Sequence, residues 1–264
     1  MNEQEIKERL AHLPLGEIRY RPRVTSTNQM AREFAADGAP DFSLVVADEQ
    51  TAGRGRQGRS WITVPGAGLA VSVLLPSESR QQPERLTGRL SGLGALAGVQ
   101  ALETACDLSA EIKWPNDLLL RGKKVGGVLV ELAWRGDVLQ EVILGVGINV
   151  RRHALPEGVR LRYPATTIEE QTGRPGNRVE LLVKFLESLL FWYPRREEER
   201  FHQAWQDSLA FRGERVQVTS SGQLLGEGRL LGLTAEGTLR IRGRAGRENI
   251  FEFGEITLRP VDRS

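Results

Sequence analysis

One short segment combines backbone freedom with fixed positive charge. Residues 53–59 read Gly-Arg-Gly-Arg-Gln-Gly-Arg, with Gln50 before them and Trp61 after them. Glycine permits backbone conformations that are closed to other residues and lets the chain approach a ligand closely. The planar arginine fork matches phosphate and carboxylate groups. The segment therefore predicts a loop that closes over an anionic ligand, with an arginine-glycine tail that binds nucleic acid as the competing interpretation.

A second segment places one carboxylate among lysines. Residues 113–117 read Lys-Trp-Pro-Asn-Asp, and three of the chain's five lysines lie between residues 113 and 124. A lysine can neutralise phosphoryl charge, and an aspartate can hold Mg²⁺ that carries substrate phosphates. The segment predicts a centre that handles phosphate groups, and a simple turn with an ion pair is the alternative.

Two further motifs have weaker individual meanings. Ser26, Thr27 and Asn28 offer hydroxyl and amide groups that either cap a helix or bind a neutral polar ligand head such as a cyclic urea. Residues 145–150 read Gly-Val-Gly-Ile-Asn-Val. Glycine inside a strand often marks the close approach of a ligand or of another backbone.

The composition narrows the class of protein. The chain has 264 residues, a net charge of +2 and 40% hydrophobic residues, which indicates a globular protein without the basic excess of a typical nucleic-acid binder. Its single cysteine, Cys106, cannot form an intrachain disulfide, and its three histidines are scattered. A zinc site or a Cys/His nucleophile pair is therefore not expected. We find no apolar signal segment, and we expect a cytoplasmic protein that does not enter membranes.

The elements around these motifs follow from hydrophobic periodicity. Apolar runs at residues 43–47 and 69–75 predict two strands, so the Gly/Arg loop joins strands inside a folded domain. Helices are expected over residues 29–36, 83–106, 178–193 and 195–209. A turn is expected at residues 121–124, and a hairpin of residues 125–134 and 138–150 turns at 135–137. This setting argues against a disordered tail, and the missing Gly-Lys-Ser/Thr ending argues against a P-loop.

The C-terminal part has a different pattern. Residues 215–260 are short β-runs separated by turn residues, which predicts a small β-barrel or sandwich. We therefore expect two domains, residues 1–211 and residues 212–264.

Five motifs together resemble the biotin protein ligases. Ser-Thr-Asn, Gly-Arg-Gly-Arg-x-Gly-Arg-x-Trp, Lys-Trp-Pro-Asn-Asp, Lys-x-Gly-Gly and Gly-x-Gly-Ile-Asn occur in that family's order, and the resemblance runs from about residue 15 to the end. It implies an α+β fold with a mixed β-sheet flanked by helices, as in the catalytic domain of class II aminoacyl-tRNA synthetases, and a small C-terminal SH3-like β-barrel.

The resemblance also implies an activity. Such enzymes use ATP and biotin, with Mg²⁺, to make biotinyl-5′-AMP and then attach biotin to a lysine of a biotin carboxyl carrier protein, such as that of acetyl-CoA carboxylase. By resemblance, the residues that contact biotin are Ser26, Thr27, Asn28, Gln50, Arg54, Gly55, Arg56 and Lys124. Those that contact ATP or the adenylate are Arg54, Arg56, Arg59, Lys113, Asn116 and Asn149.

Three residues are assigned to catalysis. By the same resemblance, Lys124 is expected at the reacting centre, and Arg56, with Arg54, is expected to hold the carboxylate and phosphate region. Asp117 is the candidate for orienting a lysine or binding Mg²⁺. Trp61 is expected to pack beneath the closed loop. Asn149 and the glycines at 145 and 147 are expected to line the pocket.

The resemblance sets the expected partners and the alternatives. Only about 25 residues precede Ser26, too few for the winged-helix domain of some members, so we expect a monofunctional ligase without DNA binding. An exposed sheet edge could pair two protomers into a homodimer. The nearest alternative is a lipoate–protein ligase of the same fold, although its arginine-rich and His-Asp motifs are absent. A nucleic-acid-binding module is the alternative from a different class.

Overall fold

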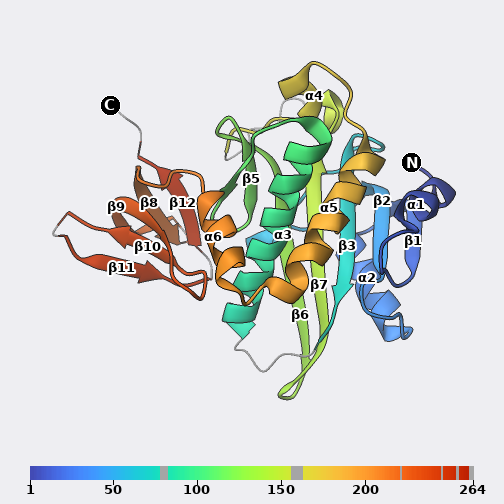
Figure 1. Cartoon of the computed structure of the whole chain (residues 1–264), viewed down its shortest axis with the longest axis horizontal. Helices are drawn as coiled ribbons and strands as arrows, with labels where there is room; N and C mark the ends of the chain where they lie inside the picture. Colours follow the sequence, from blue (N-terminus) through green and yellow to red (C-terminus); the bar gives the residue numbers. More distant parts are fainter. Residues whose placement is uncertain (78–82, 156–162, 221, 245, 254–255, 262–264) are drawn as a thin grey trace.

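Two β-sheets organise the chain (Figure 1). The computed structural model describes residues 1–77, 83–155, 163–220, 222–244, 246–253 and 256–261. The first sheet has seven strands in the order β1-β2-β3-β7-β6-β5-β4. Strands β1 and β2 are parallel and every other neighbouring pair is antiparallel, so the sheet is mixed, as predicted. Its strands are β1 (Ile18–Val24), β2 (Leu44–Gln50), β3 (Gly68–Leu75), β4 (Glu111–Lys113), β5 (Asp117–Leu120), β6 (Lys123–Arg135) and β7 (Val138–Asn149).

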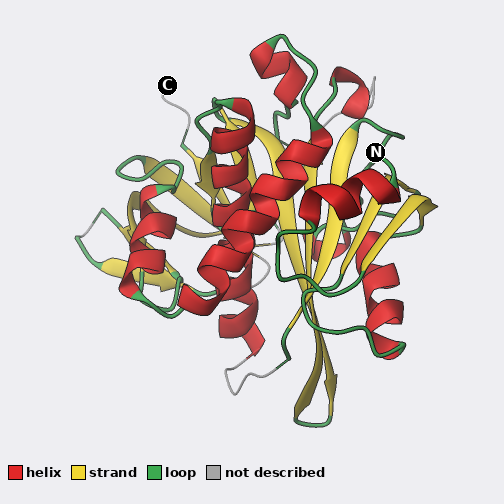
Figure 2. Cartoon of the chain, turned by 45° about the vertical axis from the view of Figure 1, so that its right-hand side comes forward, coloured by secondary structure: helices red, strands yellow, loops and turns green. Residues whose placement is uncertain are grey.

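The helices cover the two faces of this sheet unequally. They are α1 (Glu3–Leu10), α2 (Thr27–Ala36), α3 (Pro83–Cys106), α4 (Ile168–Thr172), α5 (Arg178–Trp192) and α6 (Glu199–Asp207). Because side chains alternate along a strand, Leu44 and Val46 join the core beneath α1, α3 and α5, whereas Val45 packs with Phe34 of α2 on the other face. Figure 2 shows most of the helices gathered on one face and the long β6–β7 hairpin projecting beyond the sheet. Helix α2 covers only part of the second face of the sheet, and the candidate site lies on the part that it leaves open.

Most predicted elements are confirmed, but several boundaries are wrong: β2 continues to Gln50 and α2 begins at Thr27, and two further boundaries differ as follows. The turn between β5 and β6 uses only Arg121 and Gly122, both with positive φ (48° and 73°). Two such residues suffice for a tight hairpin turn, so Lys123 and Lys124 begin strand β6 instead of lying in the turn. The helix expected from residue 195 begins instead at Glu199, after a short 3-10 turn that contains Pro194.

The C-terminal part is a five-stranded antiparallel sheet in the order β11-β10-β9-β8-β12. Its strands are β8 (Arg215–Ser220), β9 (Gln223–Leu233), β10 (Leu239–Arg242), β11 (Glu248–Phe251) and β12 (Ile256–Pro260). The change from helices to short strands is therefore confirmed. Closure into an SH3-like barrel and the boundary between residues 211 and 212 stay predictions. Within the described part of the chain, no helix has the length and apolar character needed to span a bilayer.

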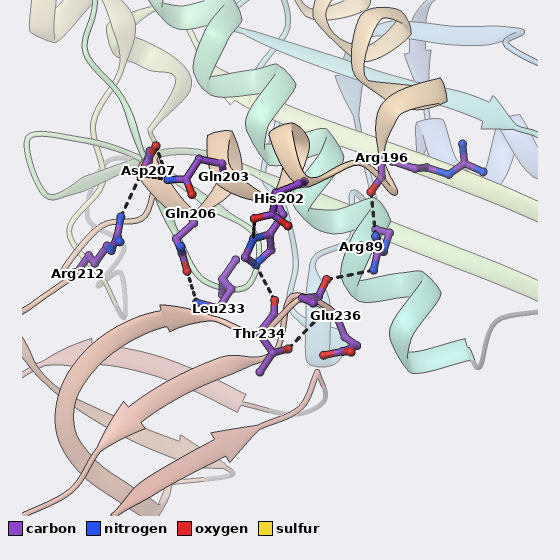
Figure 3. A network of polar contacts seen from close by, with 12 residues as sticks. Arg89, Arg196, His202, Gln203, Gln206, Asp207, Arg212, Leu233, Thr234 and Glu236 are labelled. Carbon is purple, nitrogen blue, oxygen red and sulfur yellow. Dashed lines mark hydrogen bonds and ion pairs between the residues drawn. The ribbon is translucent and has the colours of Figure 1, made fainter. Parts of the chain in front are cut away.

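Polar contacts attach this second sheet to the helices of the first (Figure 3). His202 Nε2 donates to the backbone oxygen of Thr234 at 2.8 Å, and Gln206 Oε1 accepts from the backbone nitrogen of Leu233 at 3.0 Å. Both side chains come from α6, and both partners lie where β9 ends. Side chains that reach a partner's backbone fix its position, because a buried polar group left without a partner costs free energy. Helix α6 therefore holds the C-terminal sheet beside the body of the protein.

Candidate active site

The Gly/Arg loop folds into a lid over the open part of the sheet. We call residues 53–61 the lid. Its ends are held by backbone hydrogen bonds, from Gly55 N to Arg59 O at 2.7 Å and from Trp61 N to Gly53 O at 2.8 Å. The loop joins β2 to β3, as predicted, and turns through Gln57, whose φ is 60°. The lid is therefore a closed hairpin with its arginines carried at fixed places.

Glycines form the floor beneath the lid. A Cβ atom at Gly147 would lie 2.5 Å from the ring of Trp61, and one at Gly145 would lie 2.2 Å from Asn28 Oδ1. Any larger residue at either place would push these side chains away. The two glycines do allow a close approach, but the partners are two side chains of the site and not the predicted ligand or second backbone. Trp61 lies against the floor and lines the cavity.

One end of the cavity is a network of neutral hydrogen-bonding groups. Gln50 Oε1 accepts from the backbone nitrogen of Thr27 at 2.8 Å and from Thr27 Oγ1 at 3.0 Å. Ser72 Oγ lies 2.8 Å from Thr27 Oγ1 and 2.6 Å from Asn28 Oδ1. Ser26 stands at the N-cap position of α2, but its side chain makes no capping hydrogen bond. The capping interpretation of Ser26 is therefore wrong, because Gln50 satisfies the first turn of the helix.

The other end of the cavity is cationic around a single carboxylate. Lys113 Nζ donates to Asp117 Oδ2 at 3.0 Å, and Lys124 Nζ donates to Asp117 Oδ1 at 2.5 Å. The side chain of Lys113 is 6% exposed, whereas that of Lys124 is 26% exposed. Lys124 is thus the more accessible of the two ammonium groups. Its Nζ also lies 5.6 Å from the centroid of the Trp61 ring.

The charges at this end shift the pKa of both buried partners. Burial raises the pKa of Asp117, but Lys124 and Lys113 outweigh burial and hold it below its usual value. Burial lowers the pKa of Lys113, and the neighbouring carboxylate opposes this shift only in part. Asp117 therefore stays ionised at neutral pH and keeps both ammonium groups in place.

Asp117 does not fit the predicted role of magnesium ligand. Each of its carboxylate oxygens accepts from an ammonium group, and the Arg56 guanidinium adds a third nearby cation. A divalent cation prefers oxygen ligands free of competing positive charge. The role that fits Asp117 is the other one predicted for it, the orientation of Lys124.

The lid arginines point to different parts of the site. Arg56 Nη1 donates to Asn116 Oδ1 at 3.3 Å, and burial lowers the pKa of Arg56. Arg54 Nη1 instead lies 3.7 Å from Glu131 Oε1, on the floor side. Arg59 bonds to Gln57 within the lid. Arg56 is therefore the lid arginine next to the cationic centre.

The cavity brings together nearly all of the predicted site residues. Its lining includes Ser26, Thr27, Asn28, Gln50, Arg54, Gly55, Arg56, Arg59, Lys113, Asn116, Asp117 and Lys124. Asn149 is not brought to this lining: its Nδ2 donates to the backbone oxygen of Thr166 at 3.2 Å, and its side chain is buried. The sequence reasoning missed Ser72 and Glu131, which bond to the lining residues from behind. Ser72 and Glu131 are each a polar residue within an apolar strand segment, and that contrast could have identified them from the sequence.

Trp114 connects the site to the C-terminal sheet. Its Nε1 donates to the backbone oxygen of Gly237 at 3.1 Å, and its ring centroid lies 5.1 Å from that of Phe253. Leu258 of β12 also lines the cavity. The Lys-Trp-Pro-Asn-Asp segment is therefore positioned from both sheets.

Trp114→Phe should loosen that attachment. Phenylalanine keeps an aromatic ring but lacks the pyrrole part of the buried indole, so it leaves a small cavity and the Gly237 carbonyl loses its donor. We therefore expect the free energy of unfolding to fall by about 2–4 kcal/mol. Denaturant unfolding measures the change. Trp134→Phe is the matched control, because Trp134 is 37% exposed near the end of the β6–β7 hairpin. An equal loss in both variants would contradict the expectation.

Comparison with known proteins agrees with this geometry. A model described as the biotin/lipoate A/B protein ligase family matches residues 20–149. The chain is 34% identical over 236 residues to the biotin–[acetyl-CoA-carboxylase] ligase of Paracoccus denitrificans. The aligned residues cover 86% of this chain and 95% of that protein. The chain belongs to this family. These matches place it among the family's biotin protein ligases.

Two other relatives define the extent of the likeness. A solved structure of the biotin protein ligase from Aquifex aeolicus in complex with biotin and ATP superposes with a TM-score of 0.79 at 31% identity, over 93% of this chain and 99% of that one. The bifunctional ligase/repressor BirA of Bacillus spizizenii is 36% identical over 187 residues, 70% of this chain. The match spans only 57% of the length of BirA.

Proposed function

We propose that this protein attaches biotin to a lysine of a carrier protein, using ATP and passing through biotinyl-5′-AMP. One observation carries the proposal: a single cavity joins a neutral hydrogen-bonding end at Thr27 and Asn28 to a cationic end at Lys124 and Arg56. Biotin has a matching polarity, with a neutral cyclic urea at one end and a carboxylate at the other. The family relationship and the biotin and ATP named in the Aquifex complex support the same substrates.

The first step forms the mixed anhydride. A carboxylate oxygen of biotin attacks the α-phosphorus of ATP, and the bond to the bridging oxygen breaks as pyrophosphate leaves with the electron pair. The carboxylate is already ionised near neutral pH, so this step needs no general base. It needs cations where two anions meet. Lys124 and Arg56 line the cationic end of the cavity, and the contact of Lys124 with Asp117 supports this role for them.

The second step transfers the biotinyl group. The neutral amine of the acceptor lysine attacks the acyl carbon of the adenylate, AMP leaves with the bonding electrons of the C–O bond, and the nitrogen releases one proton to solvent as the amide forms. The anhydride reacts with water, so the lid must stay closed until the carrier docks. The backbone bonds that close the lid hairpin support this role.

The partners follow from the same chemistry. We infer that the acceptor is a biotin carboxyl carrier protein, in keeping with the name of the Paracoccus relative. Magnesium enters with ATP, bound to its phosphates as part of the substrate. The cytoplasmic location and the homodimer stay predictions. The outer edge of β4 is already hydrogen-bonded to residues 208–210, so β1 is the edge strand of the seven-stranded sheet that could pair.

Biotin-dependent exchange of labelled pyrophosphate into ATP, followed by transfer to a carrier domain, tests the proposal. We expect exchange with biotin and none without it. Thermal stabilisation by lipoate in place of biotin would favour the lipoate–protein ligase. Salt-dependent binding of nucleic acid with no biotin-dependent exchange would favour the nucleic-acid-binding module.

A further inference from the structure

The carboxylate of Glu131, behind the cavity, contacts Asn28 at the neutral end of the cavity and Arg54 of the lid. Glu131 lies on β6, and its side chain is 21% exposed. Its Oε2 accepts from Asn28 Nδ2 at 2.8 Å, and its Oε1 lies 3.7 Å from Arg54 Nη1. A second hollow beneath the lid is lined by Arg54 and Glu131. One side chain thus touches both a residue at the neutral end of the cavity and a residue of the lid.

The contact with Asn28 is tightly constrained. Asn28 is 4% exposed, its Oδ1 accepts from Ser72 at 2.6 Å, and the floor at Gly145 leaves no room for it to move. An acceptor at Glu131 requires Asn28 to present its NH₂ group there and its oxygen to Ser72. The backbone oxygen of Leu129 also accepts from Asn28 Nδ2, at 3.5 Å, so Glu131 is the nearer of two acceptors that together fix which way the amide of Asn28 points.

The contact with Arg54 is of a different kind. Arg54 is half exposed, and such an ion pair contributes only about 0–1 kcal/mol. It is a weak attachment, which suits a lid that must open in each catalytic cycle. Arg54 also lines the cavity, so an anionic ligand competes with Glu131 for its guanidinium.

We propose that Glu131 is a positioning residue that orients Asn28 for the ligand head and holds the lid closed through Arg54. The two roles act through separate oxygens of one carboxylate. Binding at the neutral end and closure of the lid are therefore coupled through this Asn28–Glu131–Arg54 bridge. That the group next to Asn28 is the cyclic urea of biotin rests on the proposed function. The role of Glu131 in keeping the lid closed through Arg54 does not depend on it.

Two substitutions separate the two roles. Glu131→Gln keeps an oxygen acceptor for Asn28 and removes the charge that attracts Arg54, so its main effect should fall on the lid. Glu131→Ala removes both contacts and leaves the NH₂ group of Asn28 only the more distant backbone oxygen of Leu129, at 3.5 Å, as an acceptor. This change should also raise the KM for biotin by about tenfold to a hundredfold with a smaller effect on kcat. Glu141→Gln is the matched control, because Glu141 is a half-buried carboxylate on the neighbouring strand, paired with Arg32 at 3.4 Å.

Hydrogen exchange of the lid amides provides a readout without substrate. In Glu131→Gln we expect the amides of Gly55 and Trp61 to exchange about two- to fivefold faster than in the wild type. Arg54→Ala should give the same acceleration, and the double variant should be no faster than either single variant. The control Glu141→Gln should leave these two amides unchanged.

These experiments test the role of Glu131 independently of the proposed ligase activity. Unchanged lid exchange in Glu131→Gln, or additive acceleration in the double variant, would overturn the hold on the lid. An unchanged KM for biotin in Glu131→Ala would overturn the orientation of Asn28. If the wild type showed no biotin-dependent pyrophosphate exchange, the proposed function would fail, while the exchange of the lid amides would still test the bridge.

Discussion

Lys124→Ala should slow biotin-dependent pyrophosphate exchange by about 10²–10³-fold while the protein stays folded. Lys124 is the more exposed of the two ammonium groups at Asp117, so it is the cation that an incoming carboxylate and an α-phosphate would meet. Loss of one preorganised charge at a reacting centre costs about this much in rate. Steady-state exchange at saturating biotin and ATP measures the effect.

The fold should tolerate this change because Asp117 does not lose its last partner. Lys113 Nζ still donates to Asp117 Oδ2 at 3.0 Å. We therefore expect the free energy of unfolding to fall by about 1–3 kcal/mol, the cost of one hydrogen bond to a charged group, with the protein still folded. A loss of exchange accompanied by unfolding would show a structural effect instead.

Lys123→Ala is the matched control for the same experiment. The two lysines are adjacent on β6, and neighbouring side chains of a strand point to opposite faces. Lys123 is exposed, and it is not part of the cavity lining within the described residues. Exchange should be normal in Lys123→Ala. Normal exchange in Lys124→Ala would remove Lys124 from the reacting centre.

The sequence predicts the parts of the site that depend on residue type and spacing. The lid and the lysine–aspartate cluster each lie within a single short stretch, so the chemistry of Arg56 or Lys124 is readable before the fold is known. The apolar runs on each side of the lid also identify β2 and β3, because a buried strand needs a continuous apolar segment. The mixed sheet flanked by helices was expected from the family resemblance.

The residues that sequence reasoning missed depend on strand register. Ser72 stands in an apolar strand and reaches Asn28 only because β3 lies against β7 with Ser72 opposite Gly145. Glu131 meets both Asn28 and Arg54, which are distant in sequence from it and lie on different elements. Such contacts arise between elements, and residue spacing along the chain does not encode them. The misassigned cap at Ser26 has the same origin, because Gln50 arrives from another strand.

Arg56→Gly should release the adenylate before a carrier docks. Arg56 reaches from the lid to Asn116 at 3.3 Å and lies near Asp117. Glycine removes the guanidinium and adds backbone freedom to the lid. A loss of about 2.7 kcal/mol of hold on the adenylate would speed its escape roughly 100-fold. Because Lys124 remains, the variant should still make adenylate.

Two measurements follow the escape, the rate of adenylate release without carrier and the biotin attached to lysines of an unrelated bystander protein. Both should rise in Arg56→Gly. Ser60→Gly is the control, since it adds the same backbone freedom to the lid without removing a charge, and we expect it to retain the adenylate. Leakage of equal size in Ser60→Gly would mean that lid stiffness, rather than the Arg56 guanidinium, retains the intermediate. Bystander labelling at the wild-type level, in an Arg56→Gly variant that still forms adenylate, would show that Arg56 has no part in retention.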